Sequence, residues 1–280
     1  MQGERKFGSM AGYSVAGSLI ALVGTVILVG YFRMELAGAL VGKCFYFAVL
    51  VVIFVFVLKA VLGKPQRRAV KEFGLMKKMV LPAFIFLAGT TVLFQVDKLF
   101  VRNFAPQLSG GYGAITTWGT LPLYFIAPLV FVVFPIASAE HAGGRSVMKF
   151  FRQAMAGGLI VTVACGIVFY AIGGFLMNIL NEVYVPYAKY LGVYAVIMGF
   201  HGMIQIIASV EMARHRYSFL WFMTAGAFVM TGVLYFMRGG LTIPVVLTVL
   251  VITHLIVLVA LMVFVAKVEP AADESSAKPT

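Results

Sequence analysis

Charged side chains are scarce in this chain. Asp, Glu, Lys and Arg make up 11% of its 280 residues, apolar residues make up 62%, and the mean hydropathy is +1.00. A soluble domain could not cover its surface with so few charges, whereas a lipid bilayer makes such a composition normal. The composition therefore excludes an ordinary soluble protein and predicts a polytopic membrane protein.

Cysteine and acidic residues are also rare. Cys44 and Cys165 both lie inside apolar runs, so they indicate neither a disulfide framework nor a thiolate metal site. The ten Asp and Glu residues are scattered, and the chain has no His-Glu-x-x-His motif and no phosphate-binding glycine loop. These absences argue against an enzyme, an ATPase, a metal site and a bound cofactor.

Basic residues outnumber acidic ones and give a net charge of +12. In a soluble protein this excess would suggest nucleic-acid binding. In a membrane protein it indicates basic cytoplasmic loops that contact anionic membrane lipids. We therefore expect membrane lipids, and no nucleic acid, among the partners.

Eight apolar segments are long enough to cross the hydrocarbon core as helices, which takes about 20 residues. The predicted fold is an all-α transmembrane helix bundle. Its spans are expected at 9–31, 36–61, 79–101, 114–137, 155–180, 185–210, 219–237 and 241–266.

The basic residues also predict orientation and organisation. Sixteen of the 22 Lys and Arg residues lie near the chain ends or in alternate connections, which places both termini in the cytoplasm. A two-span part (1–62) precedes a basic cytoplasmic link (63–78) and a six-span part (79–266). The polar residues 267–280 are predicted to form a disordered cytoplasmic tail.

A charged cluster lies near the end of the span at 79–101. Gln95, Lys98 and Arg102 fall at i, i+3 and i+7, so on a helix they share one face. Asp97 points about 100° away from Lys98, so we expect its partner to come from another helix. The cationic stripe could contact an anionic group of a substrate, such as a phosphate.

Two interpretations of this stripe stay open. The predicted topology puts it near the outer end of its span, where Lys and Arg often reach the interface without any role in transport. Interfacial anchoring is therefore the simpler interpretation for Lys98 and Arg102. Asp97 has a short side chain and gains less from anchoring, which favours a structural or gating contact between helices.

The next span is rich in proline. Each proline removes a backbone donor and disturbs the preceding turn, so Pro122, Pro128 and Pro135 predict a bent or interrupted helix. Such helices suit a transporter that changes shape, but irregular packing explains prolines in membrane helices equally well.

A basic group follows that span. Arg145, Lys149 and Arg152 recur at i, i+4 and i+7 near a predicted cytoplasmic helix start. They could contact a lipid pyrophosphate, although a charge cluster that sets topology is the simpler interpretation.

Other polar residues carry weaker signals. His201 and His254 lie in separate apolar spans without a nearby acid, which favours satisfied contacts between helices over a proton relay. Glu211 is interpreted as a charge at a helix boundary. An aromatic belt is expected around the outer connection, at Tyr184, Tyr187, Tyr190 and Tyr194.

The charged cluster and the residues after it resemble a known family. The pattern Asp97-Lys98-x-x-Val101, Gly111-Tyr112-Gly113-Ala114 and Pro135-x-x-Ser138 looks like that of the polysaccharide-biosynthesis flippases. These are the O-antigen and exopolysaccharide exporters of the multidrug/oligosaccharidyl-lipid/polysaccharide superfamily. In that family a similar pattern spans the first two helices of the carboxyl-terminal lobe.

The resemblance implies a flippase in the bacterial inner membrane. Its substrate would be a polyprenyl-pyrophosphate-linked oligosaccharide for surface polysaccharide biosynthesis, with Tyr112 joining Gln95, Asp97, Lys98 and Arg102 at the substrate site or portal. A multidrug exporter of the same superfamily, or a non-transporting membrane subunit of a polysaccharide-assembly complex, are the alternatives.

The resemblance also implies missing helices. Such flippases have about twelve spans in two lobes, so eight spans correspond to the last two of one lobe and a complete second lobe. The chain is then expected to be a fragment, or to act with a separate amino-terminal lobe or with polysaccharide-assembly proteins.

Overall fold

The computed structural model describes residues 23–24, 27, 41 and 69–276. Within the last of these ranges, side chains are described for residues 81–266. The chain divides into two compact units, Met1–Leu75 and Met76–Thr280. The predicted spans at 9–31 and 36–61 fall almost wholly outside the described residues and stay predictions. The fold below is that of the second unit.

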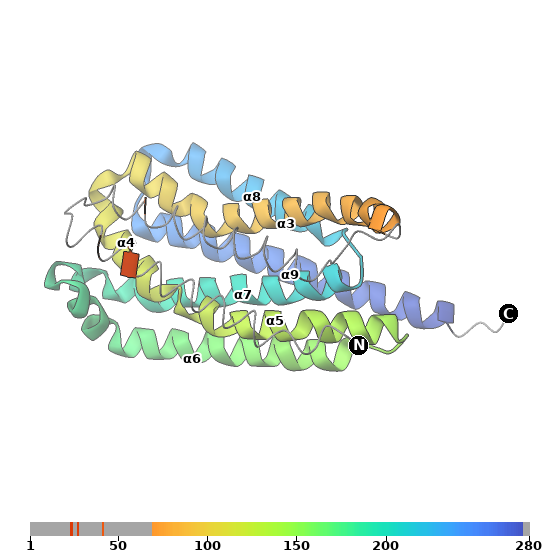
Figure 1. Ribbon diagram of the computed structural model, residues 1–280. Helices are drawn as coiled ribbons and strands as arrows, with labels where there is room; N and C mark the ends of the chain where they lie inside the picture. The colour runs from red at the N-terminus through yellow and green to blue at the C-terminus, as the bar shows by residue number, and fades with distance from the viewer. Residues whose placement is uncertain (1–22, 25–26, 28–40, 42–68, 277–280) are drawn as a thin grey trace. The chain divides into compact units, whose positions relative to one another are not determined.

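Every regular element in the described part is helical. Helix α3 is Ala69–Phe104, η2 is Pro106–Leu108, and α4 and α5 are Ser109–Gly119 and Leu121–Ala142. Helix α6 is Met148–Leu180, followed by η3 (Glu182–Tyr190), α7 (Leu191–Ala213), α8 (Phe219–Phe236), η4 (Arg238–Gly240) and α9 (Ile243–Ser276). The prediction of an all-α fold is confirmed for this part of the chain (Figure 1).

Six helical segments in the described part are long and apolar enough to cross a membrane. They coincide with the last six predicted spans, at Leu81–Phe104, Pro106–Ala142, Met148–Leu180, Glu182–Ala213, Phe219–Phe236 and Ile243–Ala266. Large apolar side chains such as Phe131, Ile160 and Trp221 are exposed on the outside of these helices. That outward apolar surface is what lipid requires.

The ends of two helices extend beyond the predicted spans. Helix α3 begins at Ala69, so the last ten residues of the predicted link, 69–78, are helical. Helix α9 continues to Ser276, which is ten residues into the predicted tail.

Helix α7 is the centre of the bundle. It contacts α4, α5, α6 and α9, and Figure 1 shows it between α9 and the α5–α6 pair. In its span 78% of the most apolar window is buried, against 22–39% in the other five spans. A polar side chain on α7 therefore lies in protein on most sides.

Glycine permits the close packing around α7. A Cβ atom at Gly199 would lie 2.3 Å from Thr162 Oγ1 on α6, and one at Gly119 would lie 2.6 Å from the ring of Tyr194. In a membrane the hydrophobic effect does not drive helices together, so they associate largely through van der Waals packing. Small residues favour this packing because they let helix backbones approach closely.

The proline-rich span is interrupted beside Pro122, as predicted, but not at Pro128 or Pro135. Helix α4 ends at Gly119 and α5 begins at Leu121, with Pro122 in the first turn, where its missing N–H costs nothing. The Thr120 hydroxyl between them donates a hydrogen bond back to the Thr116 carbonyl. Pro128 and Pro135 lie inside α5.

We predict that Gly199→Ala lowers the stability of the purified protein by about 1–3 kcal/mol, because the new methyl group overlaps Thr162. Thermal unfolding in detergent micelles measures it. Gly232→Ala on α8 is the matched control, since its Cβ meets nothing within 4 Å. Equal melting temperatures for the two variants would contradict the packing described here.

Candidate functional site

Asp97 connects three helices through its carboxylate. Its side chain is 1% exposed on α3, and its Oδ2 accepts hydrogen bonds from the hydroxyls of Tyr112 on α4 at 2.5 Å and Tyr194 on α7 at 3.4 Å. The two tyrosine rings meet edge to face, with centroids 6.0 Å apart. The prediction that Asp97 has its partner on another helix is therefore confirmed. We call these three residues the Asp97 cluster.

The Asp97 cluster leaves one oxygen without a partner. Asp97 Oδ1 is buried and accepts no hydrogen bond from any described residue. A buried carboxylate oxygen without a donor costs free energy, so the Asp97 cluster is not a fully satisfied structural contact.

Beside the Asp97 cluster lies a cavity of about 460 Å³, which we call the Lys98–Arg102 cavity. Lys98 and Arg102 line it from α3, and Tyr112 and Thr116 line it from α4. The other lining residues are Val101, Pro106, Ser109, Gly110 and Gly113. Two positive charges thus face one hollow at the end of the bundle where α3 joins α4.

Lys98 is held in place by its own helix. Its Nζ donates a hydrogen bond to Gln95 Oε1 at 3.1 Å and lies 4.0 Å from the centroid of the Phe94 ring. Arg102 is exposed, and no described residue bonds to its guanidinium. Gln95 therefore orients Lys98 but does not line the cavity itself.

His201 on α7 and His254 on α9 form a second buried polar group. Their rings lie 5.5 Å apart between centroids, and each side chain is at most 1% exposed. The expected contact between helices is therefore present, but one nitrogen of each ring lacks a hydrogen-bond partner among the described residues.

The remaining predicted site residues make no hydrogen bond to the Asp97 cluster among the described residues. Arg145, Lys149 and Arg152 are exposed around the start of α6, and Arg145 pairs with Glu140 at 2.9 Å. Pro122 is buried at the start of α5, more than two turns beyond Tyr112 in sequence, while Pro128 and Pro135 follow along α5.

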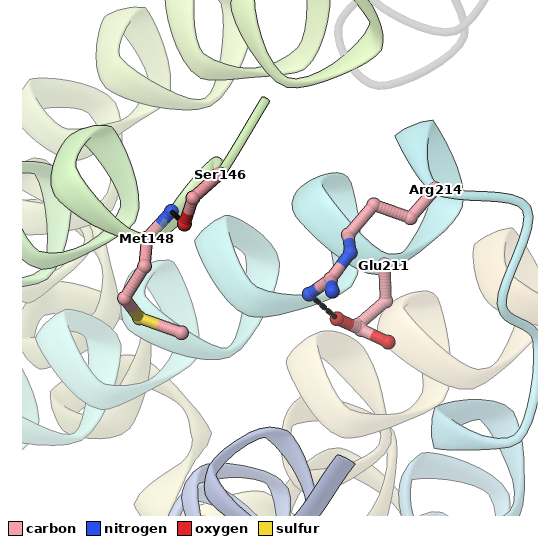
Figure 2. A network of polar contacts seen from close by, with 4 residues as sticks. All are labelled: Ser146, Met148, Glu211 and Arg214. Carbon is pink, nitrogen blue, oxygen red and sulfur yellow. Dashed lines mark hydrogen bonds and ion pairs between the residues drawn. The ribbon is translucent and has the colours of Figure 1, made fainter. Parts of the chain in front are cut away.

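Glu211 and Arg214 are more than boundary charges. Both are buried near the end of α7, and Arg214 Nη1 donates to Glu211 Oε1 at 3.3 Å. Figure 2 shows this pair near the start of α6, where the Ser146 hydroxyl accepts a hydrogen bond from the Met148 backbone amide. A buried, hydrogen-bonded ion pair of this kind fixes local structure at the opposite end of α7 from the Asp97 cluster.

Tyr194 is the site residue that sequence reasoning missed. Its position in the sequence places it with the tyrosines of the expected aromatic belt. In the structure it is fully buried and bonds to Asp97. Tyr187 also differs from a simple belt residue, because its ring packs against Gly111, where a Cβ would lie 2.6 Å away. Packing therefore explains both residues of the Gly111-Tyr112 sequence. Gly111 leaves room for the ring of Tyr187, and Tyr112 donates a hydrogen bond to Asp97.

Neither a metal ligand set nor a relative identifies the site. Within the described residues no group of three or more His, Cys, Asp or Glu could hold a metal ion. No family model, no curated protein and no solved structure matches the chain. The geometry of the described residues must therefore carry any proposal about function.

We predict that Tyr112→Phe destabilises the protein by about 1.5–3 kcal/mol, because it removes the shorter hydrogen bond to a buried carboxylate. Tyr194→Phe should cost less, since its bond is longer. Tyr170→Phe on α6, with a side chain 77% exposed, is the control. Thermal unfolding that ranks all three variants alike would contradict the assigned contacts.

Proposed function

We propose that this chain is a flippase-type transporter of the bacterial inner membrane, with both termini in the cytoplasm. Its substrate would be a polyprenyl-pyrophosphate-linked oligosaccharide for surface polysaccharide biosynthesis. The observation that carries the proposal is the Lys98–Arg102 cavity, in which two cations face one hollow beside a buried carboxylate.

The donors in the cavity favour an anion over a neutral sugar. The Ser109 hydroxyl donates to the Pro106 carbonyl, and the Thr116 hydroxyl donates to the Gly113 carbonyl, so both protons are already used. The Lys98 ammonium keeps two of its three hydrogens after bonding Gln95, and the Arg102 guanidinium keeps its donors. Cationic donors of this kind suit phosphate oxygens.

The cavity has the size of a headgroup site. Its volume of about 460 Å³ lies in the range of small-molecule pockets. That volume suits a pyrophosphate with its nearest sugar, while the polyprenyl chain would remain among the apolar outer faces of the helices. The positive lining also disfavours cationic drugs, which makes a multidrug exporter the weaker alternative.

The elements around the cavity suit a change of shape. The interrupted α4–α5 span lines it with a short helix, and the Asp97 cluster joins α3 to α4 and α7 beside it. We propose that the Asp97 cluster acts as a gate contact that breaks or forms when helices rock against one another. A separate amino-terminal lobe, or polysaccharide-assembly proteins, would complete the transporter.

We predict that Lys98→Gln with Arg102→Gln weakens binding of farnesyl pyrophosphate at least tenfold, because about 1.4 kcal/mol or more of charge-assisted bonding is lost. Isothermal titration of the full chain in neutral detergent measures the dissociation constant. Added salt should weaken binding to the wild type more than binding to the variant.

Arg238→Gln is the matched control. Arg238 follows α8, stacks on Tyr235 at 4.1 Å and does not line the cavity. Its substitution should leave binding unchanged. Equal affinity of the double variant and the wild type, or equal affinity for farnesol and farnesyl pyrophosphate, would overturn the anion site and with it the proposed function.

A further inference from the structure

The His201–His254 pair lies in the middle of the bundle, outside the cavity just described. Each residue sits about halfway along its span, on α7 and on α9, and both side chains are buried. Ionisable residues in such a place are costly. Buried polar atoms in proteins are usually hydrogen-bonded, so an unpaired one calls for an explanation. Here no described residue bonds to Nδ1 of His201 or to Nε2 of His254.

The hydrogen bonds show whether the unpaired nitrogen of each ring is a donor or an acceptor. His254 Nδ1 lies 2.8 Å from the Leu250 carbonyl, which can only accept, so Nδ1 carries the hydrogen and Nε2 is a bare acceptor. His201 Nε2 lies 3.2 Å from the Gln205 amide nitrogen and accepts from it, so the hydrogen of a neutral ring is on Nδ1. His201 therefore presents a bare donor and His254 a bare acceptor.

One charged side chain reaches this pair, and it also lines the Lys98–Arg102 cavity. The Phe94 ring has both Lys98 Nζ, 4.0 Å from its centroid, and the His201 ring, 5.8 Å away, as neighbours. The Lys98 ammonium therefore lies within about 10 Å of the His201 ring and within about 15 Å of the His254 ring.

The other elements packed around the pair bring no further charge to it among the described residues. Helix α7 contributes Gln205 and α9 contributes Thr253. Helix α5 contributes apolar Ile126, against Gly202. Asp97 is next to Lys98 in sequence, but its carboxylate is directed to Tyr112 and Tyr194.

We propose that His201 and His254 form a proton-binding site whose occupation is coupled to an anion in the Lys98–Arg102 cavity. The inference rests on the proposed function only in requiring that the cavity bind an anion. A proton from solution would add to the lone pair of His254 Nε2 and raise the charge of the pair by one. No other bond forms or breaks.

The coupling follows from the position of Lys98. Its positive charge opposes a second positive charge on the histidine pair, and an anion at Lys98 offsets that opposition. For unit charges about 15 Å apart, the bound for Lys98 and His254, and an effective dielectric constant of 20, the effect on the equilibrium constant is roughly sixfold. By linkage, a proton on the pair strengthens anion binding by the same factor.

The test measures protons taken up when sulfate binds to the full chain in detergent. Sulfate keeps its double negative charge between pH 4.5 and 7, so the probe itself does not titrate. Isothermal titration in buffers of different ionisation enthalpy gives the number of protons per sulfate. We expect net uptake by the wild type, with affinity for sulfate rising up to roughly sixfold as the pH falls.

Histidine variants locate the protonated group. His201→Gln with His254→Gln should bind sulfate without proton uptake, and His254→Gln alone provides the same readout if the double variant does not fold. His141→Gln, at an exposed position on α5, should keep the uptake. Lys98→Gln should weaken sulfate binding, because it removes one of the two cations that line the cavity.

The outcomes separate the two proposals. Sulfate binding without proton uptake in the wild type, or equal uptake after both histidines are replaced, would overturn the proton site and leave the anion cavity standing. No sulfate binding to the wild type at any pH would overturn the anion cavity, and the coupling with it.

Discussion

The hydrogen bonding of one buried carboxylate shapes the candidate site. A carboxylate that is buried among helices cannot be hydrated, so it must find its donors in protein. Asp97 finds them on α4 and α7, and this requirement brings three helices together at one point. The Lys98–Arg102 cavity exists beside that point because Lys98 and Arg102 lie on another face of the same helix.

The sequence predicted the fold class and the last six spans because apolar length is a strong signal. It also predicted that Asp97 bonds to another helix, since geometry removes Lys98 as an obvious partner. It could not select Tyr194, which is 97 residues away, because a tyrosine near a helix end satisfies an aromatic-belt pattern equally well. Only packing distinguishes a tyrosine that faces a carboxylate from one that faces headgroups.

The histidines show a related limit. Each lies alone in an apolar span, and their closeness depends on how α7 and α9 are rotated about their axes. Helix rotation is set by contacts such as Gly199 against Thr162 and Gly202 against Ile126. These contacts depend on several helices at once, so no pattern within one segment predicts the pair. Phe94 nevertheless links the two sites, because it neighbours both Lys98, which lines the cavity, and His201.

The break at Thr120 has a mechanical consequence. A continuous α-helix transmits a tilt along its whole length, but a helix divided after one-third of its span does so only up to the joint. The segments Ser109–Gly119 and Leu121–Ala142 each pack against α7, so each is held by that central helix independently of the other.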